Sequence, residues 1–151
     1  MSFINQQNGK PIKETAILLE IGMPSAVTGR TYQLDDSLRR AVRAMDGKTV
    51  YMEFGTRTRS SDLKAVDHNY VCGEITNIKL IENRSTHGHA VIVGDVRPFG
   101  PQGVRLRDTI TGADGGHNYY SINSNVRLID KKDPLKLSIA EICGCNLVDR
   151  Q

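Results

Sequence analysis

The sequence contains no apolar run of about 20 residues, which is the length that a membrane-spanning helix needs. Residues 1–13 are polar and lack the apolar core that a secretion signal carries. We therefore expect a protein that is made and kept inside a cell, or in a particle assembled there. We expect no membrane partner.

A large excess of charge of either sign is also missing. The chain has 20 Lys and Arg against 17 Asp and Glu, a formal net charge of +3. This is too small to indicate a nucleic-acid-binding protein by itself. One group of arginines, Arg39, Arg40, Arg43, Arg57 and Arg59, could be a solvated face, contact an acidic partner or form a nucleic-acid-binding module. We do not expect a nucleic-acid partner.

Cysteines and metal-binding patterns are sparse. The three cysteines, Cys72, Cys143 and Cys145, are an odd number in a chain without a signal, which favours reduced thiols. Cys143-Gly144-Cys145 has the wrong spacing for a zinc knuckle, and His87-Gly88-His89 lacks a third ligand. The glycine-rich segment 112–116 lacks the lysine and the Ser or Thr of a phosphate-binding loop. We expect no metal and no cofactor.

The composition is that of an ordinary globular protein. Of the 151 residues, 38% are hydrophobic and 25% are charged, and the length fits one domain. Residues 1–13 have little to bury, so we predict a flexible N-terminal arm followed by a single domain over residues 14–151.

Two apolar segments around a polar turn predict a central β-hairpin. The first arm covers residues 71–81, and the second covers Ala90–Val96. Both are short, rich in β-branched residues and separated by the turn-prone segment 82–88. The apolar density of Ala90–Val96 predicts burial on both faces, so the rest of the chain is expected to pack around this hairpin.

Other segments complete the predicted fold. Thr15–Ile21, Thr49–Phe54 and Tyr119–Ile129 read as strands, Leu34–Met45 as a helix with Asp35 or Asp36 as N-cap, and Val104–Ile110 as a short helix. Leu135–Val148 could be a strand or a short helix. The predicted fold class is α+β, a mostly antiparallel β-sheet with one or two helices.

A search for a nucleophile and its base leaves one pair of residues. A catalytic serine needs a base within reach, and His68 with Ser121 is the pair that we consider. His68 lies in a polar loop, where the simpler interpretation is a solvated side chain. No paired carboxylates have the spacing that acid–base catalysis requires.

The order of these features resembles one family, the tailed-phage prohead proteases of capsid maturation, which are distantly similar to herpesvirus assemblin. That family has a strand, then a motif like Asn-Gly-Arg-x-Tyr-Pro, then a helix. Here Thr28-Gly29-Arg30-Thr31-Tyr32-Gln33 precedes the helix Leu34–Met45, with Gln33 in the place of the proline. The family continues with a strand into Gly-Glu-Leu-x-His-Pro, whose His is catalytic. The corresponding segment here is Met52–Arg57, and Thr56 stands in the place of the His.

The second half of the resemblance concerns the nucleophile. In the family, two strands and a turn like Thr-Pro-x-Gly precede a short helix, an order that Ile75–Leu80, Ala90–Val96, Arg97–Gly103 and Val104–Ile110 follow. A strand with Gly-Val-Ser-Ser-Arg then holds the nucleophile and an arginine. Tyr119–Asn123 takes its place, and Ser121 is kept while the second Ser and the Arg are not. The resemblance covers residues 15–130.

These matches and departures imply a prohead-protease-like fold without the motif His, so no catalytic residue is expected. The hypothesis that follows is a non-catalytic structural protein of a phage virion, a capsid decoration or cement protein or another head protein. It would be assembled in the host cytoplasm, in many copies or as a homo-oligomer, on the major capsid protein or another virion protein. The alternative is an active prohead serine protease with a divergent site that uses Ser121 and His68.

Overall fold

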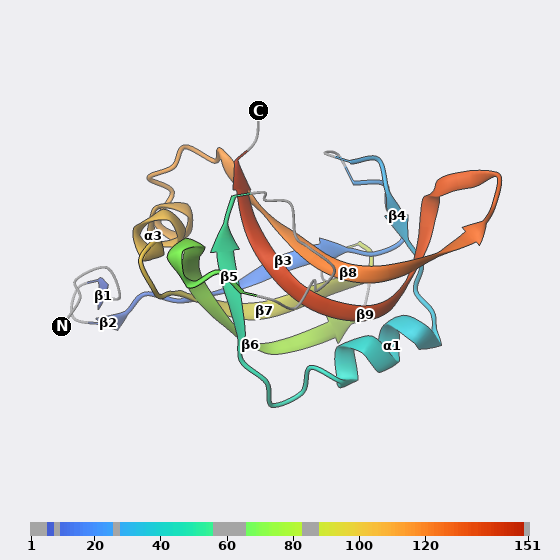
Figure 1. The fold of residues 1–151 in the computed structure, drawn as a ribbon, viewed down its shortest axis with the longest axis horizontal. Coiled ribbons are helices and arrows are strands. Elements are labelled where there is room, and N and C mark those ends of the chain that lie inside the picture. Colours follow the sequence, from blue (N-terminus) through green and yellow to red (C-terminus); the bar gives the residue numbers. More distant parts are fainter. Residues whose placement is uncertain (1–5, 8–9, 26–27, 56–65, 83–87, 150–151) are drawn as a thin grey trace.

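The computed structural model describes residues 6–7, 10–25, 28–55, 66–82 and 88–149. Figure 1 shows a strongly curved sheet with one helix at each end. The elements in chain order are β1 Gln6–Gln7, β2 Lys10–Pro11, β3 Glu14–Glu20, β4 Thr31–Tyr32, α1 Asp36–Arg43, β5 Val50–Phe54, the 3-10 turn η2 His68–Tyr70, β6 Val71–Ile81, β7 Val91–Pro98, α3 Gly103–Thr111, β8 Asn118–Asp130 and β9 Asp133–Asp149. No helix among the described residues is long and apolar enough to cross a membrane.

The predicted central hairpin is confirmed as β6 and β7. The two strands pair antiparallel, with Ile75 opposite Val96 and Leu80 opposite Ile92. β3 pairs antiparallel with the other edge of β7, so β7 lies between two strands. Burial on both faces follows the predicted pattern, since Val91, Ile92 and Val96 have no exposed surface.

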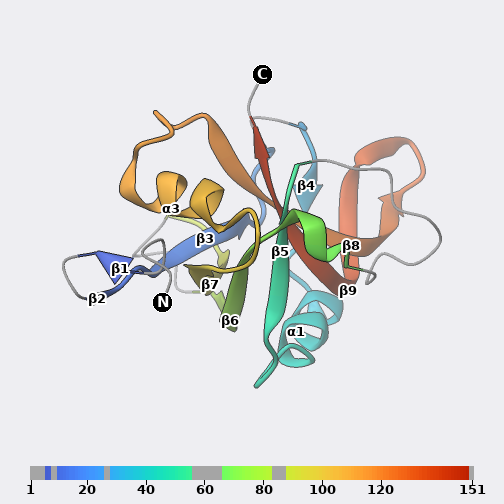
Figure 2. The ribbon, with the colours of Figure 1, turned by 60° about the vertical axis from the view of Figure 1, so that its left-hand side comes forward.

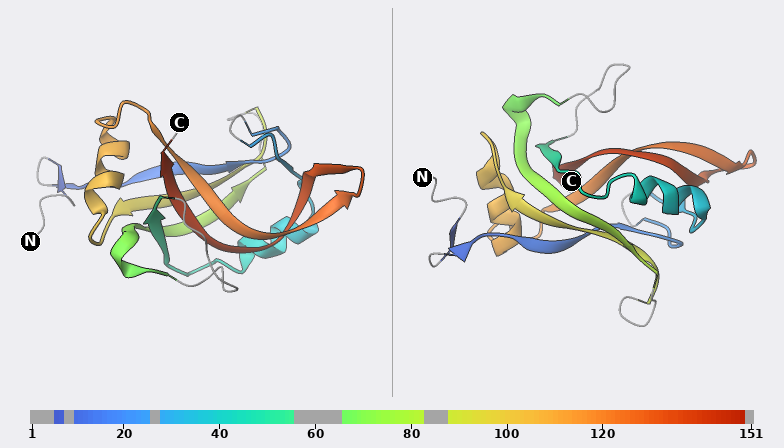
Figure 3. Two further views of the ribbon diagram at one scale, coloured as in Figure 1. Left: turned by 45° about the horizontal axis from the view of Figure 1, so that its top comes forward. Right: turned by 90° about the horizontal axis from the view of Figure 1, so that it is seen from below.

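The sheet is mixed, so the prediction of a mostly antiparallel sheet is only partly right. The strand order is β3-β7-β6-β5-β9-β4, and β8 pairs with β9 off this path. β5 and β4 both pair with β9 in parallel. Figures 2 and 3 show β9 curving along β5 and β8. The parallel pairs form because β4 and β5 pair with β9, which is far from both in the sequence. No local sequence pattern indicates such a pairing.

The C-terminal segment, which the sequence left open between strand and helix, is the long strand β9. Its central residues Ile139, Cys145 and Leu147 belong to the hydrophobic core. Three other strands of the sheet pair with it. β9 therefore joins β4 and β8 to β5, and β5 in turn pairs with β6 of the central hairpin.

The helix α1 forms where the sequence predicts it, and Asp35 is its N-cap. The Asp35 carboxylate accepts a hydrogen bond from the Leu38 backbone N–H at 2.9 Å. Leu38, Ala41 and Val42 are buried toward the sheet. Arg39 lies on the outer side and pairs with Asp36 and Glu82 at 2.8 and 2.9 Å. The positive charge of Arg39, one of the predicted group of arginines, is therefore balanced by carboxylates of the same chain.

Asp35 makes the stability of this helix depend on pH. Burial raises the Asp35 pKa, but hydrogen bonds from the Leu38 N–H, Ser138 and Gln33 and the charge of Arg127 outweigh it, so the pKa is lowered. Its stabilisation is therefore present above the pKa of the unfolded chain, about 3.9, and lost as pH falls through the native pKa. We expect Asp35→Ala to lower the free energy of unfolding by about 1 kcal/mol at pH 7.

Chemical denaturation at several pH values measures this effect. The difference between wild type and Asp35→Ala is expected to shrink as pH falls below about 4. Asp36→Ala is the control, because the neighbouring carboxyl group is exposed and does not cap the helix. A difference that stays constant down to pH 2 would contradict the role of the Asp35 charge.

The segment Arg97–Gly103, which takes the place of the family's turn, forms the end of β7 at Arg97 and Pro98 and then a turn into α3. Gly100 has a φ of +82°, and a Cβ there would lie 2.8 Å from the carbonyl oxygen of Val71. The turn therefore packs directly on the start of β6, where only glycine fits. This contact fixes Phe99 beside β5, as described below.

The predicted N-terminal arm, residues 1–13, falls largely outside the described residues. Within it, Gln6–Gln7 and Lys10–Pro11 pair as two short strands. The Ile12 side chain is buried with 5% exposure, so the end of this segment belongs to the body of the protein. Flexibility of the remainder stays a prediction.

Candidate functional site

A row of polar residues crosses three neighbouring strands. Ser121 on β8 lies opposite Asn146 on β9, and Asn146 lies opposite Glu53 on β5. Residues in register on adjacent strands share a face of the sheet, so these three side chains lie side by side. The next positions along the strands, Tyr120 with Leu147 and Phe54, are apolar and pack with the core.

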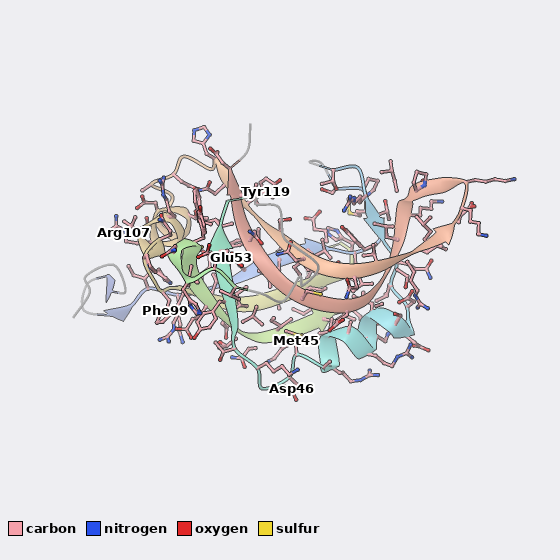
Figure 4. The ribbon with its side chains drawn as sticks, viewed as in Figure 1. Met45, Asp46, Glu53, Phe99, Arg107 and Tyr119 are labelled. Atoms are coloured by element: carbon pink, nitrogen blue, oxygen red, sulfur yellow. The ribbon has the colours of Figure 1, made fainter. Side chains whose placement is uncertain are left out.

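The polar row is largely shielded from solvent. Glu53 is 1% exposed and Asn146 is 6% exposed, whereas Ser121 is partly buried. Buried polar groups of this kind need hydrogen-bond partners. Their burial distinguishes this part of the sheet from a solvated polar surface. Figure 4 shows Glu53 on β5.

Asn146 is the centre of the row. Its Nδ2 donates to the carbonyl oxygen of Gly55 at 2.6 Å, and its Oδ1 accepts from Asn123 Nδ2 at 2.5 Å. The Gly55 N–H in turn donates to the carbonyl oxygen of Leu147 at 2.8 Å. The amide therefore ties the end of β5 to β9 and β8, and both its donor and its acceptor are occupied.

A cavity of about 360 Å³ adjoins this row. It lies between the C-terminal half of α1 and the strands β5 and β9. Met45, Val50 and Ile142 contribute apolar surface, and Glu53 lines it from the sheet. Arg40, one of the predicted arginine group, also lines it. The site thus combines a polar row with an adjoining, largely apolar hollow.

The structure places the predicted pair on different sides of β9, with His68 beside β5 and Ser121 on β8. The His68 ring packs edge-on against Tyr51 on β5 with the ring centroids 5.8 Å apart, and Phe99 stacks on Tyr51 at 5.8 Å. β9 lies between β5, which carries Tyr51, and β8, which carries Ser121. The backbones of β5 and β8 are therefore two strand spacings apart, roughly 10 Å. Proton transfer needs the two groups within about 3 Å of each other.

Other predicted positions are placed as follows. Thr56, Arg57, Arg59 and His87 lie outside the described residues. The Nε2 of His89 lies 3.6 Å from Glu20 Oε1, far along the chain from the polar row. Among the described residues, no group of three or more His, Cys, Asp or Glu could hold a metal ion.

The cysteines are free thiols, as the odd count favours. Burial, together with the neighbouring Cys145, raises the pKa of Cys72, and burial raises the pKa of Cys145 to about 12. The thiolate is the nucleophilic form, so a raised pKa leaves both groups unreactive at neutral pH. Neither cysteine offers a substitute for a serine nucleophile.

Reasoning from the sequence singled out Ser121 but missed Asn146 and the place of Glu53. A signal existed, because each is a polar residue inside an apolar segment, Ile142–Val148 for Asn146 and Val50–Phe54 for Glu53. What the sequence lacks is the register that sets the two beside Ser121. That register depends on a parallel pair formed across about 90 residues of chain.

Comparison with known proteins concerns the fold alone. No family model and no curated protein matches the sequence. A solved structure, the capsid assembly protease gp21 of bacteriophage T4, superposes with a TM-score of 0.61 at 16% sequence identity. The match covers 97% of this chain and 88% of that one. The chain therefore has a prohead-protease-like fold.

Proposed function

We propose that this chain is a phage head protein that keeps the fold of a prohead protease and works as a structural component without proteolysis. It would bind the major capsid protein or another virion protein in many copies, as a decoration or cement protein. The support for a phage context is the fold shared with a capsid assembly protease over 97% of the chain. The structural role is inferred from the site.

The observation that carries the proposal is the neighbourhood of Ser121. Its register partner is Asn146, whose donor and acceptor are both occupied by Asn123 and Gly55. An amide cannot take up and return a proton near neutral pH, so Asn146 cannot serve as the base that a serine nucleophile needs. The histidine considered as a base, His68, packs against Tyr51 two strands away.

A lost catalytic site is consistent with a retained fold, because folds host unrelated functions and activity resides in the site. Ser121 is not one of the residues that form the hydrophobic core. Asn146, at the centre of the polar row, is instead satisfied internally by its hydrogen bonds with Asn123 and Gly55, which tie β5, β8 and β9 together. Repeated copies on a capsid lattice would gain avidity, so a modest interface per copy would be enough.

We expect Ser121→Ala to leave particle assembly and maturation intact. We expect this because neither Asn146 nor His68 is placed to act as a base for Ser121, whereas removal of a true nucleophile would lower turnover by orders of magnitude. The variant is introduced into the phage that encodes the chain, and capsid protein processing is followed by mass spectrometry. A fluorophosphonate probe is expected to leave the purified wild-type protein unlabelled.

The opposite outcome defines the alternative. Stoichiometric labelling of Ser121 that is abolished by His68→Ala would establish an active protease with a divergent site. Labelling is compared with that of Ser124→Ala, because Ser124 is a partly buried serine on the same strand. Quantitative mass spectrometry of purified virions tests the structural role, which requires copies in numbers comparable to a capsid lattice.

A further inference from the structure

The ends of β8 and β9 form a hairpin that projects from the body of the protein. We call residues 124–137 the hairpin arm. Figure 1 shows the arm reaching past β4 and α1 on the right, and the left view of Figure 3 shows the same extension. All residues of β8 from Asn125 to Asp130 are exposed. The arm therefore adds little to the core, although it lengthens two strands.

One face of the arm continues the hydrophobic core into solvent. Val126 lies opposite Ile139, and Leu128 lies opposite Leu137. On β9 these residues are buried, with 0% and 5% exposure, whereas on β8 Val126 and Leu128 are 39% and 53% exposed. The apolar strip thus runs from a covered strand to an uncovered one, and Leu135 adds a further exposed apolar side chain.

The arm as a whole carries a net positive charge, because Arg127, Lys131, Lys132 and Lys136 outnumber Asp130 and Asp133. Asp130 accepts a hydrogen bond from the Lys132 N–H at 2.9 Å, and Asp133 accepts one from the Leu135 N–H at 3.1 Å. Both carboxylates therefore hold the turn, and Asp133 Oδ2 also lies 4.0 Å from Lys136 Nζ. Lys131 and Lys132 are exposed and form no ion pair within the part of the chain that the structure describes.

We propose that the hairpin arm docks a partner protein through a segment whose apolar side chains cover Val126 and Leu128 and whose carboxylates meet Lys131 and Lys132. Charge complementarity selects the partner, because an arm with a net positive charge and an apolar strip fits an apolar segment followed by acidic residues. Burial of the strip supplies affinity, and the lysines supply orientation and salt dependence. The inference does not depend on the proposed function.

Recognition takes place through side chains rather than by addition of a strand. The register between β8 and β9 shifts three times in or beside the arm, after Asn123, Asn125 and Leu128. Such irregularities twist an edge, and lysines beside it discourage pairing with another strand. The arm's open edge is therefore a poor template for strand addition, whereas its apolar face remains available. A second copy would bring an arm of the same net positive charge against this one.

The test uses the full-length chain and short fluorescein-labelled peptides. One peptide has three leucines followed by three glutamates, and two others replace the glutamates with serine or with lysine. Fluorescence anisotropy at low salt is expected to give the glutamate peptide a Kd about tenfold lower than the serine peptide. The advantage is expected to fade at about 0.5 M salt, where charges are screened.

Matched variants assign the binding to the arm. Lys131→Glu with Lys132→Glu is expected to remove the tenfold advantage, and Leu128→Ser to weaken binding of the glutamate peptide about tenfold. Arg43→Glu with Lys48→Glu changes net charge equally at exposed positions elsewhere, and should alter the Kd less than about twofold. Circular dichroism confirms that every variant is folded.

Three results would overturn the inference. The first is no saturable binding of the glutamate peptide at millimolar concentration, or equal binding of the lysine peptide. The second is tighter binding of a labelled oligothymidylate that the two lysines control, which would make the tip a nucleic-acid site. The third is a wild-type dimer in sedimentation that Leu128→Ser dissociates, which would assign the strip to a second copy.

Discussion

Ile92→Ala is expected to lower the free energy of unfolding by about 2–5 kcal/mol. Ile92 has no exposed surface, and β7 is enclosed by β3 and β6 through pairs with Leu19 and Leu80. Truncation to Ala removes three carbon atoms from the side chain. Because β7 is hydrogen-bonded to β3 on one edge and to β6 on the other, it cannot shift to fill the space that is left. The cost therefore includes the lost burial and the cavity that remains.

Urea denaturation at pH 7 measures this loss, with the slope of the transition checked against wild type. Ile17→Ala is the matched control, because Ile17 lies on the neighbouring strand β3 but is 42% exposed. The control is expected to cost less than about 1 kcal/mol. A loss below about 1 kcal/mol for Ile92→Ala itself would show that the β6–β7 hairpin is not the centre of the core.

The hairpin could be predicted because its signals are local. β-branched residues, a polar turn and two apolar arms lie within 30 residues, and β6 and β7 follow that pattern closely. The helix α1 could be predicted for the same reason. The Asp35 cap and the buried residues Leu38, Ala41 and Val42 lie within three turns of one another in the sequence. The second helix, predicted over Val104–Ile110, is present as Gly103–Thr111.

The parallel strand pairs could not be predicted in this way. β9 carries Pro134 near its start, and Cys143-Gly144-Cys145 interrupts its apolar pattern, so the segment fits neither a clear strand nor a clear helix. Its strand form is imposed by β5 on one side and β8 on the other. Tertiary contacts override weak local preference in such a segment, and the mixed sheet results from them.

The candidate site illustrates the same limit. The family resemblance led to Ser121 and to the missing His at Thr56, both of which are properties of single positions. The polar row requires three strands from distant parts of the chain, and its buried members Glu53 and Asn146 have meaning only in register. Sequence reasoning could therefore find the serine but not the amide that faces it.

Asn146→Asp is expected to destabilise the protein by about 3 kcal/mol or more at pH 7. The ionised carboxylate would be an acceptor only, so it would face the Gly55 carbonyl oxygen, which now receives a hydrogen bond from Nδ2 at 2.6 Å. The carboxyl group of Glu53 is its register neighbour on β5 and is 1% exposed. The substitution adds a buried charge where two oxygen groups already lie.

The pH dependence distinguishes this cause from a simple loss of packing. Burial and the neighbouring oxygens favour the neutral acid, so the native pKa of the new carboxyl group is raised above its unfolded value of about 3.9. The native state then binds the extra proton, and stability falls as pH rises from about 4 through the native pKa. Below about pH 4 the protonated acid can donate to the Gly55 carbonyl oxygen and accept from Asn123, as the amide does. The variant is therefore expected to approach wild-type stability there.

Chemical denaturation of wild type and variant between pH 3.5 and 8 provides the measurement. Asn69→Asp is the control, because Asn69 is exposed in the turn before β6, and a new carboxyl group in water should keep an ordinary pKa. The control is expected to change stability by less than about 0.5 kcal/mol at every pH. If Asn146→Asp were equally destabilised at pH 4 and pH 7, the amide would act through its shape alone. If it cost nothing at pH 7, the polar row would be open to water, and the internal hydrogen bonds that we assign to it would not hold β5, β8 and β9 together.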